Sequence, residues 1–228
     1  MKSVTKYIAA LLVLTAAAAF ALRSRPCGNP CTAAGGGFRV CSGDLLFFAD
    51  DTSAMEDAIR QSTAGEGRMP FTHVAMVEVC DGGCFIIEAA SDGVTRRRID
   101  AGDRSPVCVY RLRGDIDGRS RIIADAIARS RQFIGQPYDY WFMPDNGRMY
   151  CSELIYECFR RTDGEPLFTA RPMNFRAADG SMPEYWTELF ARLGEPVPEG
   201  VPGTNPADMS AEECIEHLYT GRLSQLEP

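Results

Sequence analysis

Histidine is scarce in this chain, with only His73 and His217 among 228 residues. Imidazole is a common general base and the commonest metal ligand, so a reaction that needs one must use one of these two. The cysteines that could join them as zinc ligands form only loose pairs, Cys27 with Cys31 and Cys80 with Cys84, and the two histidines lie far apart in sequence. These spacings argue against a zinc site, and we expect neither a metal nor another cofactor.

An excess of basic residues is also missing. Lysine and arginine number 24 against 31 aspartates and glutamates, which gives a formal net charge of −7. A nucleic-acid-binding surface needs a basic footprint, so we expect no nucleic-acid partner. The one compact basic run, at residues 96–98, is typical of the solvated edge of a strand.

Long apolar runs are absent except at the amino terminus. The run from Tyr7 to Leu22 follows Lys2 and Lys6, and small residues near its end offer cleavage sites. This pattern predicts a secretory signal peptide over residues 1–22, with an uncleaved membrane anchor as the alternative. We therefore expect an exported protein, periplasmic or associated with the cell envelope, that contacts a membrane only through an uncleaved amino-terminal segment.

The rest of the chain divides into a short linker and one domain. Glycine and proline are frequent over residues 23–40, which predicts a linker, and residues 41–228 are long enough for a single domain with its own core. The chain has nine cysteines. Some can pair in an oxidising compartment, and the odd total leaves at least one thiol free or intermolecular.

Apolar patterning predicts an α+β fold in which helices pack on a small antiparallel sheet. Strands are expected over residues 45–49, 71–80, 84–90, 94–99 and 107–113. Helices are expected over residues 54–61, 119–134, 151–161 and 183–193, and Ser210 is expected to cap a last short helix that contains His217.

A predicted hairpin can bring His73 and Glu88 close together. If its turn centres on residues 81–82, Glu88 faces Ala75 and His73 lies diagonal to Glu88 on the same face, within reach of long side chains. A turn centred one residue earlier puts the two directly opposite each other. A turn with an odd number of loop residues puts them on opposite faces of the sheet, unless a β-bulge shifts one strand by a residue. The alternatives are a core histidine with satisfied hydrogen bonds and a glutamate on the exposed face of an edge strand.

Cys151 stands at the start of a predicted amphipathic helix. The positive end of the helix dipole and the free N–H groups there stabilise a thiolate, and the same N–H groups can bind an oxyanion. Cys158, two turns later on the apolar stripe, is interpreted as core filling. The alternative for Cys151 is a small buried residue or half of a disulfide.

Together these residues resemble a known family. The blocks Gly43–Phe47, Phe71–Val77, Ile87–Ala89, Gly135–Asp139 and Tyr150–Leu154 occur in this order. The chain resembles the YiiX-like group of permuted papain-fold enzymes, relatives of the NlpC-type cell-wall peptidases, over roughly residues 41–210.

The resemblance implies a circularly permuted papain-like core in which the histidine precedes the cysteine. By this likeness Cys151 is the nucleophile, His73 the base and Glu88 the residue that orients the base. Tyr138 and Glu153 are candidate substrate-binding residues. The alternatives are a packing role for Tyr138 and, for Glu153, anchoring of the helix start or simply a first-turn acid.

Three functions follow as hypotheses. The first is a cysteine hydrolase of the peptidase or amidase type, acting on cell-wall peptide or a small amide substrate. The second is a thiol acyl hydrolase or acyltransferase acting on lipid, which an apolar groove beside Cys151 would favour. The third is an inactive module that binds a peptide or amino acid, which a disulfide at Cys151 would favour.

Overall fold

The computed structural model describes residues 37–49, 52–65, 68–80 and 83–228. The predicted signal peptide or anchor and most of the predicted linker lie outside these residues. Within them, the helices are all too short or too polar to cross a membrane.

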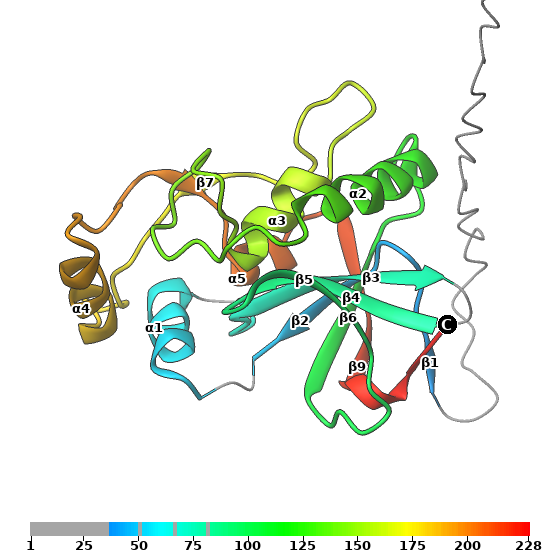
Figure 1. Ribbon diagram of the computed structural model, residues 1–228, viewed down its shortest axis with the longest axis horizontal. Helices are drawn as coiled ribbons and strands as arrows, with labels where there is room; N and C mark the ends of the chain where they lie inside the picture. The colour runs from blue at the N-terminus through cyan, green and yellow to red at the C-terminus, as the bar shows by residue number, and fades with distance from the viewer. Residues whose placement is uncertain (1–36, 50–51, 66–67, 81–82) are drawn as a thin grey trace, which may run out of the picture.

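The centre of the molecule is a six-stranded antiparallel sheet with the order β5-β4-β3-β2-β6-β9 (Figure 1). Its strands are β2 (Leu45–Phe48), β3 (His73–Cys80), β4 (Gly83–Ala90), β5 (Gly93–Arg98), β6 (Pro106–Leu112) and β9 (Ile215–Arg222). Two short pairs lie outside it: β1 (Phe38–Arg39) with β10 (Leu226–Glu227), and β7 (Arg171–Pro172) with β8 (Pro202–Gly203).

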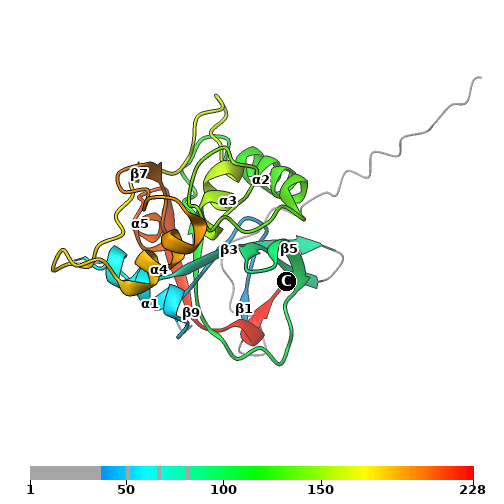
Figure 2. The same ribbon diagram turned by 60° about the vertical axis from the view of Figure 1, so that its left-hand side comes forward.

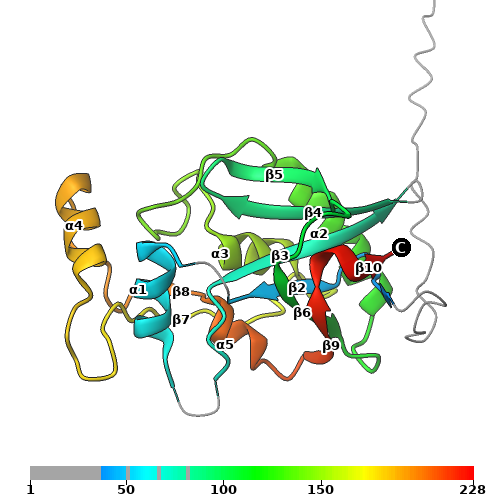
Figure 3. The ribbon, with the colours of Figure 1, turned by 90° about the horizontal axis from the view of Figure 1, so that it is seen from below.

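Helices cover one face and one end of the sheet. The helices are α1 (Ala54–Thr63), α2 (Arg119–Phe133), α3 (Cys151–Cys158), α4 (Glu184–Leu193) and α5 (Pro206–Ser210), and a 3₁₀ turn η1 follows at Leu223–Gln225. α3 packs on β3 and β4 with α2 beside it (Figures 1 and 2), and α1 packs against α4 at one end of the molecule (Figure 3).

Both faces of the sheet are buried because its central strands are apolar at nearly every position. In β3, Val74 and Met76 belong to the core under α3, whereas Ala75 and Val77 belong to a second core that contains Leu223. Alternate side chains of a strand point to opposite faces, so one strand serves both cores. The sheet therefore holds the start of β3, with His73, in a fixed position against α3.

The structure corrects the predictions at both ends of the domain. No helix starts at Ser210 in the described structure: α5 ends there, and His217 lies exposed on β9. Asn205 caps α5 and Pro206 is its first residue, a strong start signal that the proline-rich context concealed. Residues 38–40, the end of the predicted linker, belong to the folded domain, where Phe38 and Val40 are buried.

Candidate active site

The β3–β4 hairpin brings His73 and Glu88 together. Met76 pairs with Ile87, the register in which His73 lies diagonal to Glu88 on one face of the sheet. The imidazole Nε2 lies 2.8 Å from a carboxylate oxygen of Glu88, and the Glu88 side chain is only 9% exposed. A buried carboxylate at this distance fixes the orientation of the ring and leaves the other nitrogen, Nδ1, available.

Arg97 holds the same carboxylate from its other side. Its Nε donates to the second oxygen of Glu88 at 2.7 Å, from the neighbouring strand β5. Burial alone would raise the pKa of Glu88, but the bonds and charges of His73 and Arg97 outweigh it and lower this pKa to about 2. Glu88 is therefore a carboxylate at any physiological pH.

Arg97 is a site residue that the sequence analysis missed. Strand β5 is an edge strand, but the basic run on it is not simply solvated, because Arg96 also pairs with the buried Glu78. Glu88 pairs with Thr95, so Arg97, two residues on, returns to the same face. Because side chains of a strand alternate between the two faces of the sheet, Arg97 could have been predicted once Glu88 was identified as a site residue.

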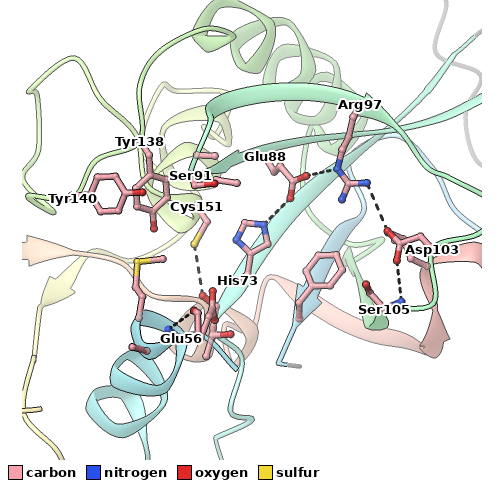
Figure 4. Close-up of a pocket in the computed structure, with 18 of the residues that line it drawn as sticks. Glu56, His73, Glu88, Ser91, Arg97, Asp103, Ser105, Tyr138, Tyr140 and Cys151 are labelled. Carbon is pink, nitrogen blue, oxygen red and sulfur yellow. Dashed lines mark hydrogen bonds and ion pairs between the residues drawn. The ribbon is translucent and has the colours of Figure 1, made fainter. Parts of the chain in front are cut away.

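Cys151 meets the ring on the side opposite Glu88. It is the first residue of α3, and Figure 4 shows its thiol beside His73. Burial lowers the pKa of His73, but hydrogen bonds and charge interactions with Cys151 and Glu88 reverse the shift and raise this pKa to about 10. The three predicted residues therefore form one chain of contacts from carboxylate to imidazole to thiol.

The thiol is buried yet borders solvent. Cys151 is 5% exposed, and its sulfur lies 4.0 Å from the carbonyl oxygen of Thr72. It also lines a cleft of about 570 Å³. Besides His73 and Glu88, the polar side chains around this cleft include those of Ser53, Glu56, Ser91, Arg97, Asp103 and Ser105, together with the hydroxyls of Thr72, Tyr138, Tyr140 and Tyr185.

Tyr138 and Glu153 have different places. Tyr138 lines the cleft beside Cys151, and burial together with the nearby Cys151 and Glu56 raises its pKa well above the ordinary value. Its hydroxyl thus stays protonated and able to donate. Glu153 lies outside the lining of the cleft and accepts the backbone N–H of Tyr150 at 3.3 Å. Burial raises the pKa of Glu153 to about 8 despite this bond, and the contact anchors the start of α3.

The other described cysteines lack such partners or have a structural role. Cys151 is a free thiol, as are Cys80, Cys84, Cys108, Cys158 and Cys214. Cys158 is fully buried in the core, and burial raises its pKa to about 12, in keeping with a thiol that only fills space. Cys41 is disulfide-bonded.

The low pKa of Glu88 predicts a pH-dependent contribution to stability. Because the folded value of about 2 lies below the ordinary 4.5, the contribution is present above pH 4.5 and is lost as the pH falls toward 2. The difference in unfolding free energy between wild type and Glu88→Gln should therefore be largest above pH 4.5 and shrink on acidification. Urea unfolding between pH 3 and 6 measures it, and a gap that stays constant over this range would contradict the assignment.

Comparisons with known proteins identify the family of this chain. Residues 39–219 match the model of the family described as permuted papain-like amidase enzyme, YaeF/YiiX, C92 family. The uncharacterized protein YiiX of Escherichia coli (strain K12) is 22% identical over 162 residues, which are 69% of this chain and 75% of that protein.

A solved structure shows the same fold. The crystal structure of metalloprotein yiiX from Escherichia coli O157:H7 superposes with a TM-score of 0.62 at 19% identity, covering 78% of this chain and 96% of that one. Among the described residues of this chain, no three His, Cys, Asp or Glu side chains are grouped so that they could hold a metal ion. The match extends over nearly the whole described domain, and the chain belongs to the YaeF/YiiX (C92) family of permuted papain-like amidases.

Proposed function

We propose that this protein is an exported cysteine hydrolase that cleaves an amide bond through Cys151. One observation carries the proposal: a free thiol at a helix start and an imidazole oriented by a buried carboxylate border the same cleft. A nucleophile, a base and a group that orients the base are the three parts that thiol catalysis requires.

The geometry assigns a step to each group. His73 holds the proton of Cys151 in a thiolate–imidazolium pair, and the thiolate attacks the carbonyl carbon. The backbone N–H of Cys151 has no intrahelical acceptor because it lies in the first turn of α3, and it faces the developing oxyanion. The C–N bond breaks as the imidazolium gives its proton to the leaving amine. His73 then deprotonates a water that hydrolyses the thioester and restores the thiol.

The charged side chains of the cleft suit a polar substrate such as a cell-envelope peptide or a small amide, and apolar side chains such as Phe48, Met55 and Leu223 line the cleft beside them. Carboxylates and a guanidinium line it, including Glu56, Asp103 and Arg97. A fatty-acyl substrate would need an extended apolar groove beside Cys151. The apolar hollow that borders Cys151 in the described structure measures only about 60 Å³, so the lipid-directed alternative has less support.

Two further observations support export of the protein and its activity as an enzyme. The disulfide at Cys41 supports export, because such bonds persist in oxidising compartments. The free thiol of Cys151 and the assembled chain of contacts to Glu88 support an active enzyme over an inactive binding module.

Alkylation of the wild-type protein tests the proposal. Iodoacetamide at pH 6.5, followed by peptide mapping over time, should label Cys151 at least about tenfold faster than the partly exposed Cys108 and Cys214, because a thiol paired with an imidazole reacts as a thiolate. A Cys108→Ala variant serves as the control and should leave the rate at Cys151 unchanged. Labelling of Cys151 no faster than Cys108 would count against the assignment.

A further inference from the structure

A second hollow borders the nucleophile and differs from the cleft in size and chemistry. It measures about 60 Å³, against about 570 Å³ for the cleft, and the two share Thr72, Tyr138 and Cys151 as walls. His73 lines the cleft but not the smaller hollow. We call the smaller hollow the chamber. Most of its accessible lining is apolar. The apolar side chains are Ile59, Phe142, Tyr150, Met173, Phe175, Trp186 and Pro206, and the polar ones are Ser62, Thr63, Thr72, Ser152, Asn174, Thr204 and Asn205.

The chamber walls are rigid. The ring of Trp186 packs edge-on against Phe142 and Phe175, with centroids 5.5 and 5.2 Å apart. The indole N–H donates to the hydroxyl of Ser62 at 3.0 Å, and that hydroxyl donates to the carbonyl of Phe175 at 2.8 Å. Because the rings hold one another through these contacts, the aromatic side of the chamber cannot widen without breaking them. The hydroxyls of Thr72, Ser152 and Thr204 in the other walls are buried without a hydrogen-bond partner in the described structure.

One wall of the chamber has a strained backbone that hydrogen bonds hold in place. Phe142 has a φ of 52°, a left-handed conformation that an ordinary side chain adopts only at a cost of about 1–3 kcal/mol. The buried carboxylate of Asp139 accepts the backbone N–H groups on either side, from Trp141 at 2.9 Å and Met143 at 2.8 Å. Strain of this kind clusters at active sites and ligand clamps.

The position of His73 decides which part of a substrate enters the chamber. The imidazolium must give its proton to the leaving amine, so the amine has to lie on the imidazole side of the sulfur, in the cleft. The other substituent of the same carbonyl carbon then points away from the imidazole. Of the two hollows at Cys151, the chamber is the one that His73 does not line.

We propose that the chamber is the acyl subsite of the enzyme and accepts the short alkyl part of an acyl group of up to about four carbons, while the larger amine occupies the cleft. The proposal rests on the hydrolase function proposed above and specifies its substrate class. A volume of about 60 Å³ leaves room for a few carbon atoms, so a short alkyl group fits the chamber better than a fatty chain.

Esters with one leaving group and acyl chains of increasing length test the proposal. The probes are the p-nitrophenyl esters of acetate, butyrate, hexanoate and decanoate, and the readouts are the rate of p-nitrophenolate release and the mass of the acylated Cys151 peptide. The acylation rate should fall at least about tenfold from butyrate to decanoate. A rate that stays level or rises with chain length, on a Cys151 that does become acylated, would overturn the chamber assignment alone. Acylation that never reaches Cys151 would instead overturn the hydrolase itself and the chamber with it.

Variants that fill or enlarge the chamber sharpen the test. Thr63 on α1 lines the chamber, and Thr63→Met should lower the ratio of butyrate to acetate rates about tenfold. Gln61→Met, two residues earlier on the same helix and exposed, is the matched control and should leave the ratio unchanged. Met173→Ala enlarges the chamber and should raise the ratio of hexanoate to acetate rates, which keeps the proposal falsifiable if Thr63→Met does not fold. Equal ratios in Met173→Ala and wild type would count against the subsite.

Discussion

His73→Ala is expected to slow the hydrolysis of p-nitrophenyl acetate at Cys151 by about 10³-fold or more. The variant loses the base that forms the thiolate and the acid that protonates the leaving group, and general acid–base catalysis of this kind contributes about 10²–10⁴-fold. Loss of one member of a catalytic triad removes most of what the whole triad supplies. The measurement is the rate of p-nitrophenolate release at pH 7, compared with wild type.

The pH dependence of alkylation separates this role from a structural one. With the pKa of His73 raised to about 10, its positive charge persists across the neutral range, so the rate at which iodoacetamide labels Cys151 should depend less steeply on pH between 6 and 8 in wild type than in His73→Ala. In His73→Ala the rate should rise about tenfold per pH unit toward the ordinary thiol range near 8.5.

The second histidine provides the control. His217 is exposed on β9, and its ring contacts the backbone carbonyl of Tyr219 and the hydroxyl of Thr220. His217→Ala should therefore keep both the rate and the pH profile of wild type. A His73→Ala variant that matched wild type in its pH profile, whatever its loss of rate, would show that the imidazole does not charge the thiol.

The core of the site could be predicted because its signals are local. The alternation of the hairpin and its turn limited His73 and Glu88 to a few registers, and the structure has the first of those considered. The start of α3 follows from the apolar stripe that begins after Cys151. What joins the hairpin to the helix is long-range packing of α3 on β3 and β4, and the sequence suggested that contact only through its likeness to a family.

Other features had weaker signals or none. The chamber is built from side chains more than 100 positions apart, such as Ser62 and Trp186, and no periodicity relates them. The positive φ of Phe142 could not be anticipated, because phenylalanine rarely adopts this conformation. Asn205 and Pro206, by contrast, form a helix start of a common kind, and it was missed because Pro206 lies in a proline-rich stretch that favours extended chain.

A buried ion pair beside β2 gives a structural role to Asp44, which belongs to the sequence block Gly43–Phe47. Arg111 on β6 donates to both carboxylate oxygens of Asp44, at 2.6 and 2.7 Å, and Asp44 also accepts the backbone N–H of Cys41 at 2.8 Å. Asp44 is 1% exposed and Arg111 6%. The pair ties the start of β2 to β6, on the side of β2 opposite His73 and β3.

Arg111→Leu is expected to lower the free energy of unfolding by about 3–5 kcal/mol, because it leaves the carboxylate of Asp44 buried without its cation. Denaturant unfolding at pH 7 measures the loss. Arg121→Leu is the matched control: Arg121 is 77% exposed and lies 3.6 Å from Asp125, so its loss should cost less than about 1 kcal/mol. Similar losses in the two variants would contradict the argument.

A double variant distinguishes an unpaired charge from lost packing. If the cost in Arg111→Leu comes from the stranded carboxylate, then Asp44→Leu combined with Arg111→Leu should be more stable than Arg111→Leu alone, because both charges leave the interior together. Recovery should be incomplete, since the N–H of Cys41 loses its acceptor in the double variant. A double variant less stable than Arg111→Leu would mean that the stranded carboxylate of Asp44 is not the source of the loss.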